Sequence, residues 1–149
     1  MSEISDFSGG NHFLSNFHPS PVTMDGVIYP TVEHAYQAAK TIDHAEREVI
    51  RTSPGPGMAK KLGRHVTVRP DWETTKIAVM TELVYQKFTN DARLANKLIA
   101  TDGFTLVEGN WWGDVFWGVC KGKGSNHLGH ILMAVRRSLM EDQHERSAA

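Results

Sequence analysis

The chain has 149 residues, 40% hydrophobic and 22% charged, which is the size and composition of one globular domain. Its 16 Lys and Arg against 17 Asp and Glu give a net charge of -1, which argues against a protein that binds nucleic acid mainly through a positive field. Cys120 is the only cysteine, which excludes an intramolecular disulfide and a site of several thiolates. We expect a cytoplasmic protein, because the sequence contains neither a signal-peptide core nor an apolar stretch of about 20 residues.

The first half of the chain predicts a hairpin followed by short helices. Asp25-Gly26 separates two short apolar segments and is a strong signal for a two-residue turn. Pro30 ends the second strand, and Thr31 can cap the helix that follows. Helical segments are expected at 31–41, 44–51 and 58–63.

The second half carries the clearest helical pattern. Apolar residues recur every three or four positions from Asp71 to Thr89, which predicts a core helix capped by Asp71. Asn90 can cap a further helix that carries Leu94 and Leu98. The remaining expected elements are a short strand or extended connector at 65–69, a strand at 104–108, and a last helix at 127–141 followed by a frayed polar tail.

These elements predict an α+β fold in a single compact domain, mostly helical with a few short strands. Strands and helices do not alternate as they do in a doubly wound sheet. Neither the glycine-rich dinucleotide motif nor the P-loop occurs, so the two common nucleotide-binding architectures are not expected.

One stripe of the helix expected at 31–41 has an unusual set of charges. Glu33, Gln37 and Lys40 fall at i, i+4 and i+7 and share this stripe. Glu33 and Lys40 are two turns apart and are too distant to pair along the helix. The stripe therefore faces either water or a pocket in which an acid and an amine meet a ligand.

A second candidate region is the segment at 109–129, which contains three of the four tryptophans and many glycines. Tryptophan offers a flat surface on which a heterocycle can stack, and glycine allows the backbone to approach a ligand. The alternative is a buried aromatic cluster under a glycine-rich loop. Asp114 favours a binding role, because a carboxylate beside apolar surface needs a function or a partner.

The segment KGKGSN at 121–126 leads directly into the last expected helix. Free amides at a helix start, a flexible glycine approach and two lysines can hold a phosphate. The alternative, which the spacing alone favours, is a solvated loop with an ordinary Ser or Asn cap. Arg64, in KKLGRH, can also meet a phosphate, but we expect it to face water.

Three further features give weaker signals. Asn16, in FLSNF, can hydrogen-bond a base edge, a ribose or its own backbone. His127 and His130 have no third ligand at a recognisable spacing and no HExxH motif occurs, so we expect neither a metal nor another cofactor. Cys120 lies in an apolar run and is expected in the core rather than as a catalytic thiol.

Several motifs follow the order found in the NADAR, or YbiA-like, superfamily. They extend from Phe13 to Leu139 and are FLSNF, YPTVEHAYQAAK, GR followed by RPDWE, KF, KLIAT, LVEGN, WWGD and GKGSNHLGHILMAVR. The chain resembles this family over nearly its whole length. The resemblance implies one YbiA-like domain at 1–149, with its core at about 13–139 and polar tails at both ends.

The resemblance also implies an activity, that of an N-glycosidase, a hydrolase that cleaves a ribosyl C1′–N bond. Two substrate classes are associated with the family: ribosylamino-pyrimidine phosphates of the early riboflavin pathway and ADP-ribose attached to guanine. The expected partner is therefore a small ribosyl phosphate or ADP-ribosylated nucleic acid, and no membrane. After Asp114 the segment VFWGVCKGKG replaces a shorter glycine-rich segment that some family members have. Substrate choice is therefore the property that the resemblance implies least directly.

The resemblance assigns catalytic roles to Glu33, Lys40 and Asp114. Cleavage develops positive charge at C1′, which Glu33 can stabilise, or Glu33 can activate the attacking water. Lys40 can orient a phosphate or Glu33, or attack the ring-opened sugar to form a Schiff base. Asp114 can bind ribose hydroxyls or assist proton transfer. The expected substrate-binding residues are Asn16, Phe17, Gln37, Trp72, which also fits a core stripe, Trp112, Gly122, Gly124 and Asn126.

Two other classes of function are compatible with these residues. A non-catalytic module for ADP-ribose or a nucleotide would use the same pocket without turnover. The presence of both Glu33 and Asp114 favours an enzyme, since stacking and phosphate binding require neither. A nucleic-acid-binding domain would use the tryptophans as stacking platforms, and the neutral charge balance argues against it as the main function.

Overall fold

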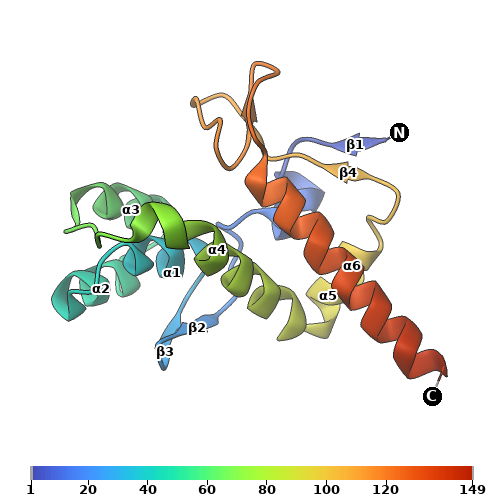
Figure 1. Ribbon diagram of the computed structural model, residues 1–149, viewed down its shortest axis with the longest axis horizontal. Coiled ribbons are helices and arrows are strands. Elements are labelled where there is room, and N and C mark those ends of the chain that lie inside the picture. Colours follow the sequence, from blue (N-terminus) through green and yellow to red (C-terminus); the bar gives the residue numbers. More distant parts are fainter. Residues whose placement is uncertain (1, 149) are drawn as a thin grey trace. The chain divides into compact units, whose positions relative to one another are not determined.

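A computed structural model describes residues 2–148 of the chain (Figure 1). Within these residues the chain forms two compact units. Of the described residues, unit 1 combines 2–15 with 88–148, and unit 2 is the continuous segment Asn16–Lys87. No helix of the described residues has the length and apolar character required to cross a membrane.

Unit 2 begins with an antiparallel hairpin of two strands, β2 (Val22–Met24) and β3 (Val27–Tyr29). The turn residues Asp25 and Gly26 have φ angles of 50° and 78°. Positive φ at both central positions is the geometry that a two-residue hairpin turn requires. The hairpin predicted from Asp25-Gly26 is confirmed.

Short helices form the rest of unit 2. They are α1 (Val32–Ala39), α2 (His44–Arg51), α3 (Pro56–Leu62), the 3-10 turn η2 (Gly63–His65) and α4 (Trp72–Thr89), whose last two residues belong to unit 1. Thr31 caps α1 by accepting a hydrogen bond from the His34 amide at 3.0 Å. Asp43 caps α2 by accepting one from the Glu46 amide at 2.9 Å. The predicted helices are confirmed, and the segment at 66–69 is an irregular connector rather than a strand.

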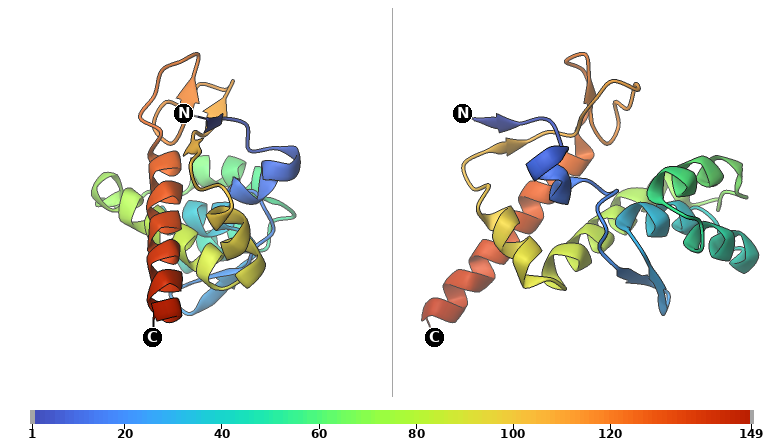
Figure 2. Two further views of the ribbon diagram at one scale, coloured as in Figure 1. Left: turned by 90° about the vertical axis from the view of Figure 1, so that its right-hand side faces the viewer. Right: turned by 180° about the vertical axis from the view of Figure 1, so that it is seen from behind.

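Helix α1 is the central element of unit 2. It packs against α2, α3 and the hairpin, and all eight of its residues are buried. Figures 1 and 2 show α2 and α3 beside it. The small side chains of Ala35, Ala38 and Ala39 allow these neighbours to approach closely. Polar side chains on such a helix are therefore enclosed as well.

Unit 1 is built from both ends of the chain. Two pairs of very short parallel strands join distant segments: β1 (Glu3–Ile4) with β4 (Thr105–Leu106), and β5 (Gly109–Asn110) with β6 (Val119–Cys120). The helical elements are η1 (Gly9–Leu14), α5 (Ala92–Ile99) and α6 (His127–Ala148). Helix α6 packs on α5 and β4, as the views of Figure 2 show, through Leu128, Ile131, Leu132 and Val135.

The α+β class, mostly helical with short strands, is confirmed. Three expectations about the ends of elements are wrong. Helix α5 is capped by Asp91, which accepts hydrogen bonds from the Arg93 and Leu94 amides, and not by Asn90. Residues 142–148, expected to fray, continue α6, and the N-terminal segment supplies β1 instead of a free tail.

Candidate active site

The residues expected to form the site divide between the two units. Unit 2 holds Asn16, Phe17, Glu33, Gln37, Lys40 and Trp72, and unit 1 holds Trp112, Asp114, Gly122, Gly124 and Asn126. In each unit, most of these residues are tied to neighbouring elements by hydrogen bonds or ring contacts.

The stripe of α1 is enclosed rather than solvated. Glu33 is 7% exposed and Gln37 is 4% exposed. The Gln37 amide nitrogen Nε2 donates a hydrogen bond to Glu33 Oε2 at 3.1 Å, across the i, i+4 interval. The carboxylate is thus removed from water and held in one orientation. This arrangement is typical of a carboxylate that acts on a ligand rather than one that solubilises a helix.

Asn16 supports the start of this helix. Its backbone carbonyl accepts a hydrogen bond from the Glu33 amide at 3.2 Å, which satisfies one of the amides that a helix start leaves unpaired. Its side chain Nδ2 lies 3.5 Å from the sulfur of Met80. Asn16 therefore lies next to Glu33 and links it to α4.

Lys40 follows the last residue of α1 and is half-buried. Burial lowers the pKa of its ammonium group from the usual value, and the Glu33 carboxylate opposes this shift. Three neighbouring cations lower the pKa further, namely Arg64, Lys60 and Lys76. A lowered pKa increases the fraction of neutral amine, which is the form that attacks a carbonyl carbon.

Trp72 has a packing role in this part of unit 2. It is 6% exposed, and its ring lies against that of Tyr36 with centroids 5.2 Å apart and planes at 52°. The Lys40 Nζ atom lies 5.8 Å from the centroid of the same Tyr36 ring. Trp72 thus supports Tyr36, and little of its indole surface is left for a ligand.

Gly63 is a neighbour of the stripe to which the sequence analysis gave no role. A Cβ atom at this position would lie 1.9 Å from Gln37 Oε1 and 2.7 Å from Gln37 Cδ, so any other residue would displace the Gln37 amide. The Gln37 amide is consequently held between the Glu33 carboxylate and the Gly63 backbone. Gly63 belongs to the GR motif. The structural reason for a glycine here is a contact between α1 and η2, which a local sequence pattern does not reveal.

Two buried titratable residues of unit 2 were also missed. His34 is 1% exposed, its Nδ1 lies 2.8 Å from the Thr31 hydroxyl, and burial lowers its pKa. Lys87 is 2% exposed, which is rare for lysine. The only available signal for Lys87 was its place in the KF motif.

In unit 1, Asp114 has backbone partners. Its Oδ1 accepts hydrogen bonds from the Phe116 amide at 3.1 Å and the Trp117 amide at 2.9 Å. Asn110 binds the Asp114 backbone from both sides, donating to its carbonyl at 2.8 Å and accepting from its amide at 2.9 Å. One carboxylate oxygen of Asp114 therefore stabilises a turn, which accounts for this residue without a ligand.

The start of α6 does not offer the free amides that a phosphate cradle requires. The amides of residues 125–128 donate to backbone carbonyls of residues 115–118 at 2.8 to 3.3 Å. The Asn126 side chain is also engaged: Oδ1 accepts from the Glu108 amide and Nδ2 donates to the Leu106 carbonyl, both at 3.0 Å. The expectation of free amides at this helix start is wrong, because the preceding loop folds back onto it.

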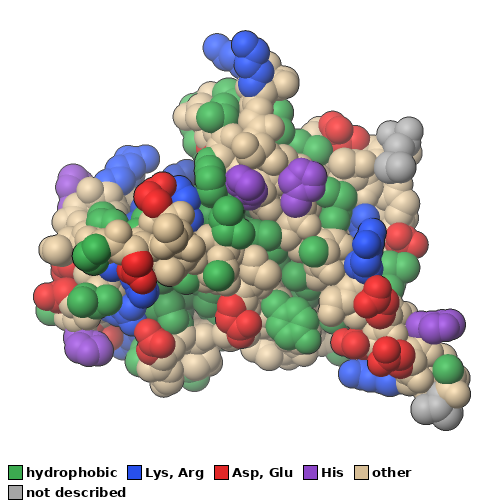
Figure 3. All heavy atoms as spheres, viewed as in Figure 1, with side chains coloured by type: hydrophobic (Ala, Val, Ile, Leu, Met, Phe, Trp, Pro, Cys, Tyr) green, Lys and Arg blue, Asp and Glu red, His purple; other side chains and the backbone are tan. Residues whose placement is uncertain are grey.

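The two glycines of this loop differ in their surroundings. Gly124 packs closely, since a Cβ there would lie 2.1 Å from the Gly118 carbonyl oxygen. Gly122 has a φ of 76° and open space around it. Lys121 and Lys123 are exposed, and Figure 3 shows Lys or Arg side chains at the tip of the loop that precedes α6.

Trp112 retains ring surface for a ligand. It is 48% exposed, and its ring lies nearly perpendicular to that of Trp111, which is 84% exposed, with centroids 5.6 Å apart. Exposed indoles are costly in water and are suited to stacking on a base. This pair is the part of the tryptophan-rich segment that fits the expected stacking role.

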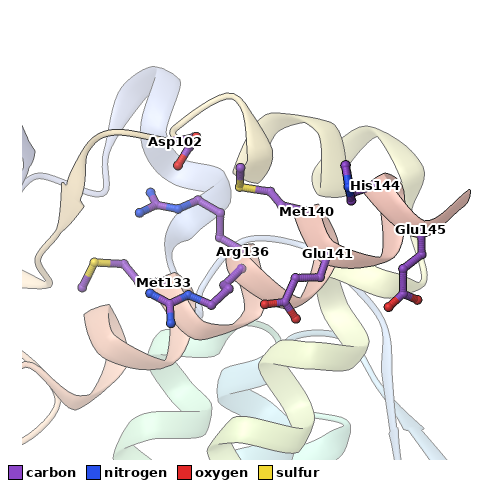
Figure 4. Close-up of a pocket in the computed structure, with 8 residues that line it drawn as sticks. Asp102, Met133, Arg136, Met140, Glu141, His144 and Glu145 are labelled. Carbon is purple, nitrogen blue, oxygen red and sulfur yellow. The ribbon is translucent and has the colours of Figure 1, made fainter. Parts of the chain in front are cut away.

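Figure 4 shows a cavity of about 520 Å³ in unit 1. It is lined by Asp102, Met133, Arg136, Arg137, Met140, Glu141, His144 and Glu145. The Arg136 Nη1 atom donates to the Thr101 and Phe104 carbonyls at 2.9 and 3.0 Å, so this cation fastens α6 to the loop after α5. None of the expected site residues lines this cavity.

A second cavity of about 520 Å³ lies in unit 2 between the hairpin and α4. Its two arginines are both paired, Arg47 with Asp25 at 2.7 Å and Arg69 with Asp71 at 2.7 Å. The expected site residues do not line it either. Residues 2–148 contain no group of three metal-binding side chains, and Cys120 is buried as predicted.

The comparison with known proteins decides the family. The profile described as the NADAR domain matches residues 4–140. This chain belongs to the NADAR family. The profile spans segments of both units, and the bounds of the domain core, at about 13–139, stay a prediction.

Relatives of this NADAR domain carry informative names. The chain is 40% identical over 129 residues to "N-glycosidase YbiA" of Escherichia coli (strain K12), covering 85% of this chain and 80% of that protein. The NMR structure of E. coli YbiA matches with a TM-score of 0.85 at 36% identity, covering 96% of this chain and 86% of that one. "Riboflavin biosynthesis protein VVA0006" of Vibrio vulnificus (strain YJ016) is 38% identical over 135 residues, which are 88% of this chain and 36% of that longer protein.

Proposed function

We propose that this protein is an N-glycosidase, a hydrolase of the ribosyl C1′–N bond, with Glu33 at the centre of its active site. The activity is the one named for its E. coli relative. The observation that carries the proposal is the enclosed Glu33 carboxylate, which Gln37 orients at 3.1 Å. An acid in this setting is suited to a reaction that develops positive charge on a bound sugar.

Glu33 would act as the C1′–N bond breaks. The departing base takes the bonding electrons and leaves oxocarbenium character at C1′, which a carboxylate stabilises. Glu33 can also accept a proton from the water that attacks C1′. Either role requires the carboxylate to be oriented and shielded from bulk water, and burial together with the Gln37 amide supports both.

Lys40 offers a covalent alternative. If the ribosyl ring opens, the neutral Lys40 amine can attack C1′ and expel the base amine, which forms a Schiff base between lysine and sugar. Water then attacks this Schiff base, releases the sugar aldehyde and restores the amine. The lowered pKa of Lys40 supports this route, because it raises the fraction of neutral amine.

As substrate we propose a phosphorylated N-riboside. The two candidates are a ribosylamino-pyrimidine phosphate of the early riboflavin pathway and ADP-ribose linked to guanine in nucleic acid. The name of the Vibrio relative, a riboflavin biosynthesis protein, favours the first. The exposed Trp112 fits a stacking role with the base.

The other candidate residues have more modest roles in this proposal. Asp114 keeps one oxygen, Oδ2, for a ribose hydroxyl while Oδ1 stabilises its turn. Asn16, Phe17 and Gln37 would line the sugar side of the site, and Gln37 acts mainly by positioning Glu33. The contributions of Trp72, Gly124 and Asn126 are proposed to come through packing, and Gly122 provides an open turn.

The experiment is product formation followed by mass spectrometry. Both candidate substrates are incubated with wild type, with Glu33→Gln and with Glu82→Gln, an exposed carboxylate of α4 that serves as the matched control. We expect one substrate to be turned over, the Glu33→Gln rate to fall by a factor of about 100 or more, and the control to stay active. Equal rates in wild type and Glu33→Gln would remove Glu33 from the mechanism. No turnover of either substrate, with ADP-ribose still bound, would identify a non-catalytic binding module.

A further inference from the structure

Four cationic side chains of unit 2 form a cluster around Lys40, on whose ammonium group the Glu33 carboxylate also acts. They come from four elements and are Lys40 at the end of α1, Lys60 of α3, Arg64 of η2 and Lys76 of α4. Figure 3 shows Lys and Arg side chains over the part of unit 2 that holds α3 and the start of α4. These residues are far apart in the sequence, so the sequence pattern does not reveal the cluster. The packing of α3 against α1 brings its members together.

The geometry of α3 and η2 directs two of these cations to α1. Residues 60, 63 and 64 share one face of this continuous helical segment, by their i, i+3 and i+4 spacing. Gly63 on that face touches Gln37, because a Cβ there would lie 1.9 Å from Oε1. Lys60 and Arg64 therefore flank the point at which η2 meets the residue that holds Glu33.

Two carboxylates lie beside this cluster of cations. Lys76 is paired with Glu73 at 2.9 Å, and Glu33 is the other carboxylate that acts on Lys40. Arg64 is exposed and forms no ion pair with any of residues 2–148. Cationic side chains such as these bind the oxygens of a phosphate monoester, which carries about -1.5 to -2 charges at neutral pH.

The other basic segment, the loop before α6, is less suited to a phosphate. Its helix-start amides at 125–128 already donate to backbone carbonyls. Lys121 and Lys123 remain; both are exposed, as Arg64 is, but no half-buried lysine accompanies them in this loop. Lys40 and Lys60 are half-buried, so an anion beside them is less screened by water.

We propose that Lys60 and Arg64 hold a phosphate of the substrate close to Lys40. For the chemistry of the substrate this inference rests on the proposed function, since a phosphorylated riboside has its sugar and its phosphate on one small molecule. Arg64, expected from the sequence to face water, becomes a specificity-determining residue. It selects phosphorylated ribosides over free ones.

The test measures binding of ribose 5-phosphate and of ribose by calorimetry. Wild type is compared with the double variant Lys60→Gln/Arg64→Gln and with Arg137→Gln, an exposed arginine of α6, as the matched control. We expect the Kd for ribose 5-phosphate to rise about tenfold or more in the double variant, because two charge-assisted hydrogen bonds are lost. The control should keep the wild-type Kd, and thermal unfolding should verify that all three proteins are folded.

Two results would overturn the inference. One is an unchanged Kd for ribose 5-phosphate in the folded double variant. The other is a higher Kd in Lys121→Gln/Lys123→Gln with the double variant unaffected, which would assign the phosphate to the loop before α6. Added salt should weaken binding of ribose 5-phosphate to wild type and leave ribose unaffected.

The binding experiment tests the phosphate site independently of the proposed function, because binding is measured without turnover. Weakened phosphate binding in the double variant, together with no hydrolysis of either candidate substrate, would support the phosphate site and reject the N-glycosidase. Hydrolysis that is lost in Glu33→Gln, with phosphate binding unchanged in the double variant, would do the reverse.

Discussion

At the scale of single residues, the site candidate is defined by what surrounds the Glu33 carboxylate. The Gln37 amide donates a hydrogen bond to this carboxylate, and the Gly63 backbone lies against the Gln37 amide. Lys40 lies one helical turn after Gln37. The i, i+4 relation of Glu33 to Gln37 is visible in the sequence. The contact with Gly63 is not, because it depends on how α1 and η2 pack.

Gly63→Ala tests whether this arrangement is needed. The added Cβ collides with the Gln37 amide, so we expect the free energy of unfolding to fall by about 1 to 3 kcal/mol. We also expect activity to fall, because Glu33 loses its oriented partner. Gly57→Ala in the same segment is the control: nothing lies within 4 Å of its Cβ, and alanine favours a helix by about 1 kcal/mol.

Urea unfolding and substrate turnover are measured on both variants. Similar stabilities of the two variants would contradict the close contact between Gly63 and Gln37. A stable, folded Gly63→Ala with wild-type turnover would show that the Gln37 orientation does not matter.

Lys40 predicts a dependence on pH. Its folded-state pKa lies below the ordinary lysine value because of burial and the neighbouring cations. The neutral amine therefore accumulates as pH rises through this lowered pKa, and reaches its maximum at a lower pH than for an ordinary lysine. We expect the rate of Schiff-base trapping by borohydride, in the presence of substrate, to follow the same curve.

The readout is the mass of a reduced sugar adduct on the peptide that contains Lys40, with Lys40→Arg as control. Trapping in wild type and its absence in Lys40→Arg support the covalent route. Turnover without any adduct at any pH would leave Glu33 and water as the mechanism.

At the scale of elements, the loop that precedes α6 is a structural unit in its own right. Asp114 and Asn110 stabilise its turn, and its carbonyls accept the first amides of α6. From the sequence alone, its glycines and polar residues indicate a ligand-binding loop. A glycine-rich loop that folds back onto a helix has the same composition as one that binds an anion, so composition does not separate the two.

Asn126→Ala distinguishes a packing role from a phosphate role. The Asn126 side chain satisfies the Glu108 amide and the Leu106 carbonyl, and removal leaves both without this partner. We expect the free energy of unfolding to fall by about 2 to 4 kcal/mol. Ser125→Ala, at an exposed neighbour, serves as control in the same urea titration. Unchanged stability of Asn126→Ala with a raised KM would restore the phosphate role.

Elements whose signals are local were predicted well. The hairpin follows from Asp25-Gly26, and the start of α1 from Thr31, because turn and cap geometry depend on adjacent residues. The cap of α5 shifted by one residue because Asn90 and Asp91 are both good caps. The two-residue parallel strands were beyond reach, since nothing in so short a segment indicates its distant partner.

At the scale of the whole molecule, the N-terminal segment is part of unit 1 rather than a tail. The Thr105 amide donates to the Ser2 carbonyl and the Val107 amide to the Ile4 carbonyl, both at 2.9 Å. Gly109 packs on Ser5, because a Cβ there would lie 2.1 Å from the Ser5 carbonyl oxygen. The polar composition of this segment concealed these backbone interactions.

Deletion of residues 2–5 should therefore destabilise the protein. We expect a loss of about 1 to 3 kcal/mol in the free energy of unfolding, from the hydrogen bonds of β1. Deletion of residues 146–149 is the control, because residues 146–148 are exposed at the end of α6. Equal unfolding midpoints in urea for the two truncations would contradict the role of β1.

The construction of unit 1 from both chain ends also constrains the order of events during synthesis. The ribosome delivers residues 16–87, all of unit 2, before Thr105 and Leu106 exist to pair with β1. The first strand must stay unpaired while about 100 further residues are translated. Closing so long a loop is slow compared with forming a helix, so the nascent chain acquires the Glu33 helix early and its N-terminal strand late.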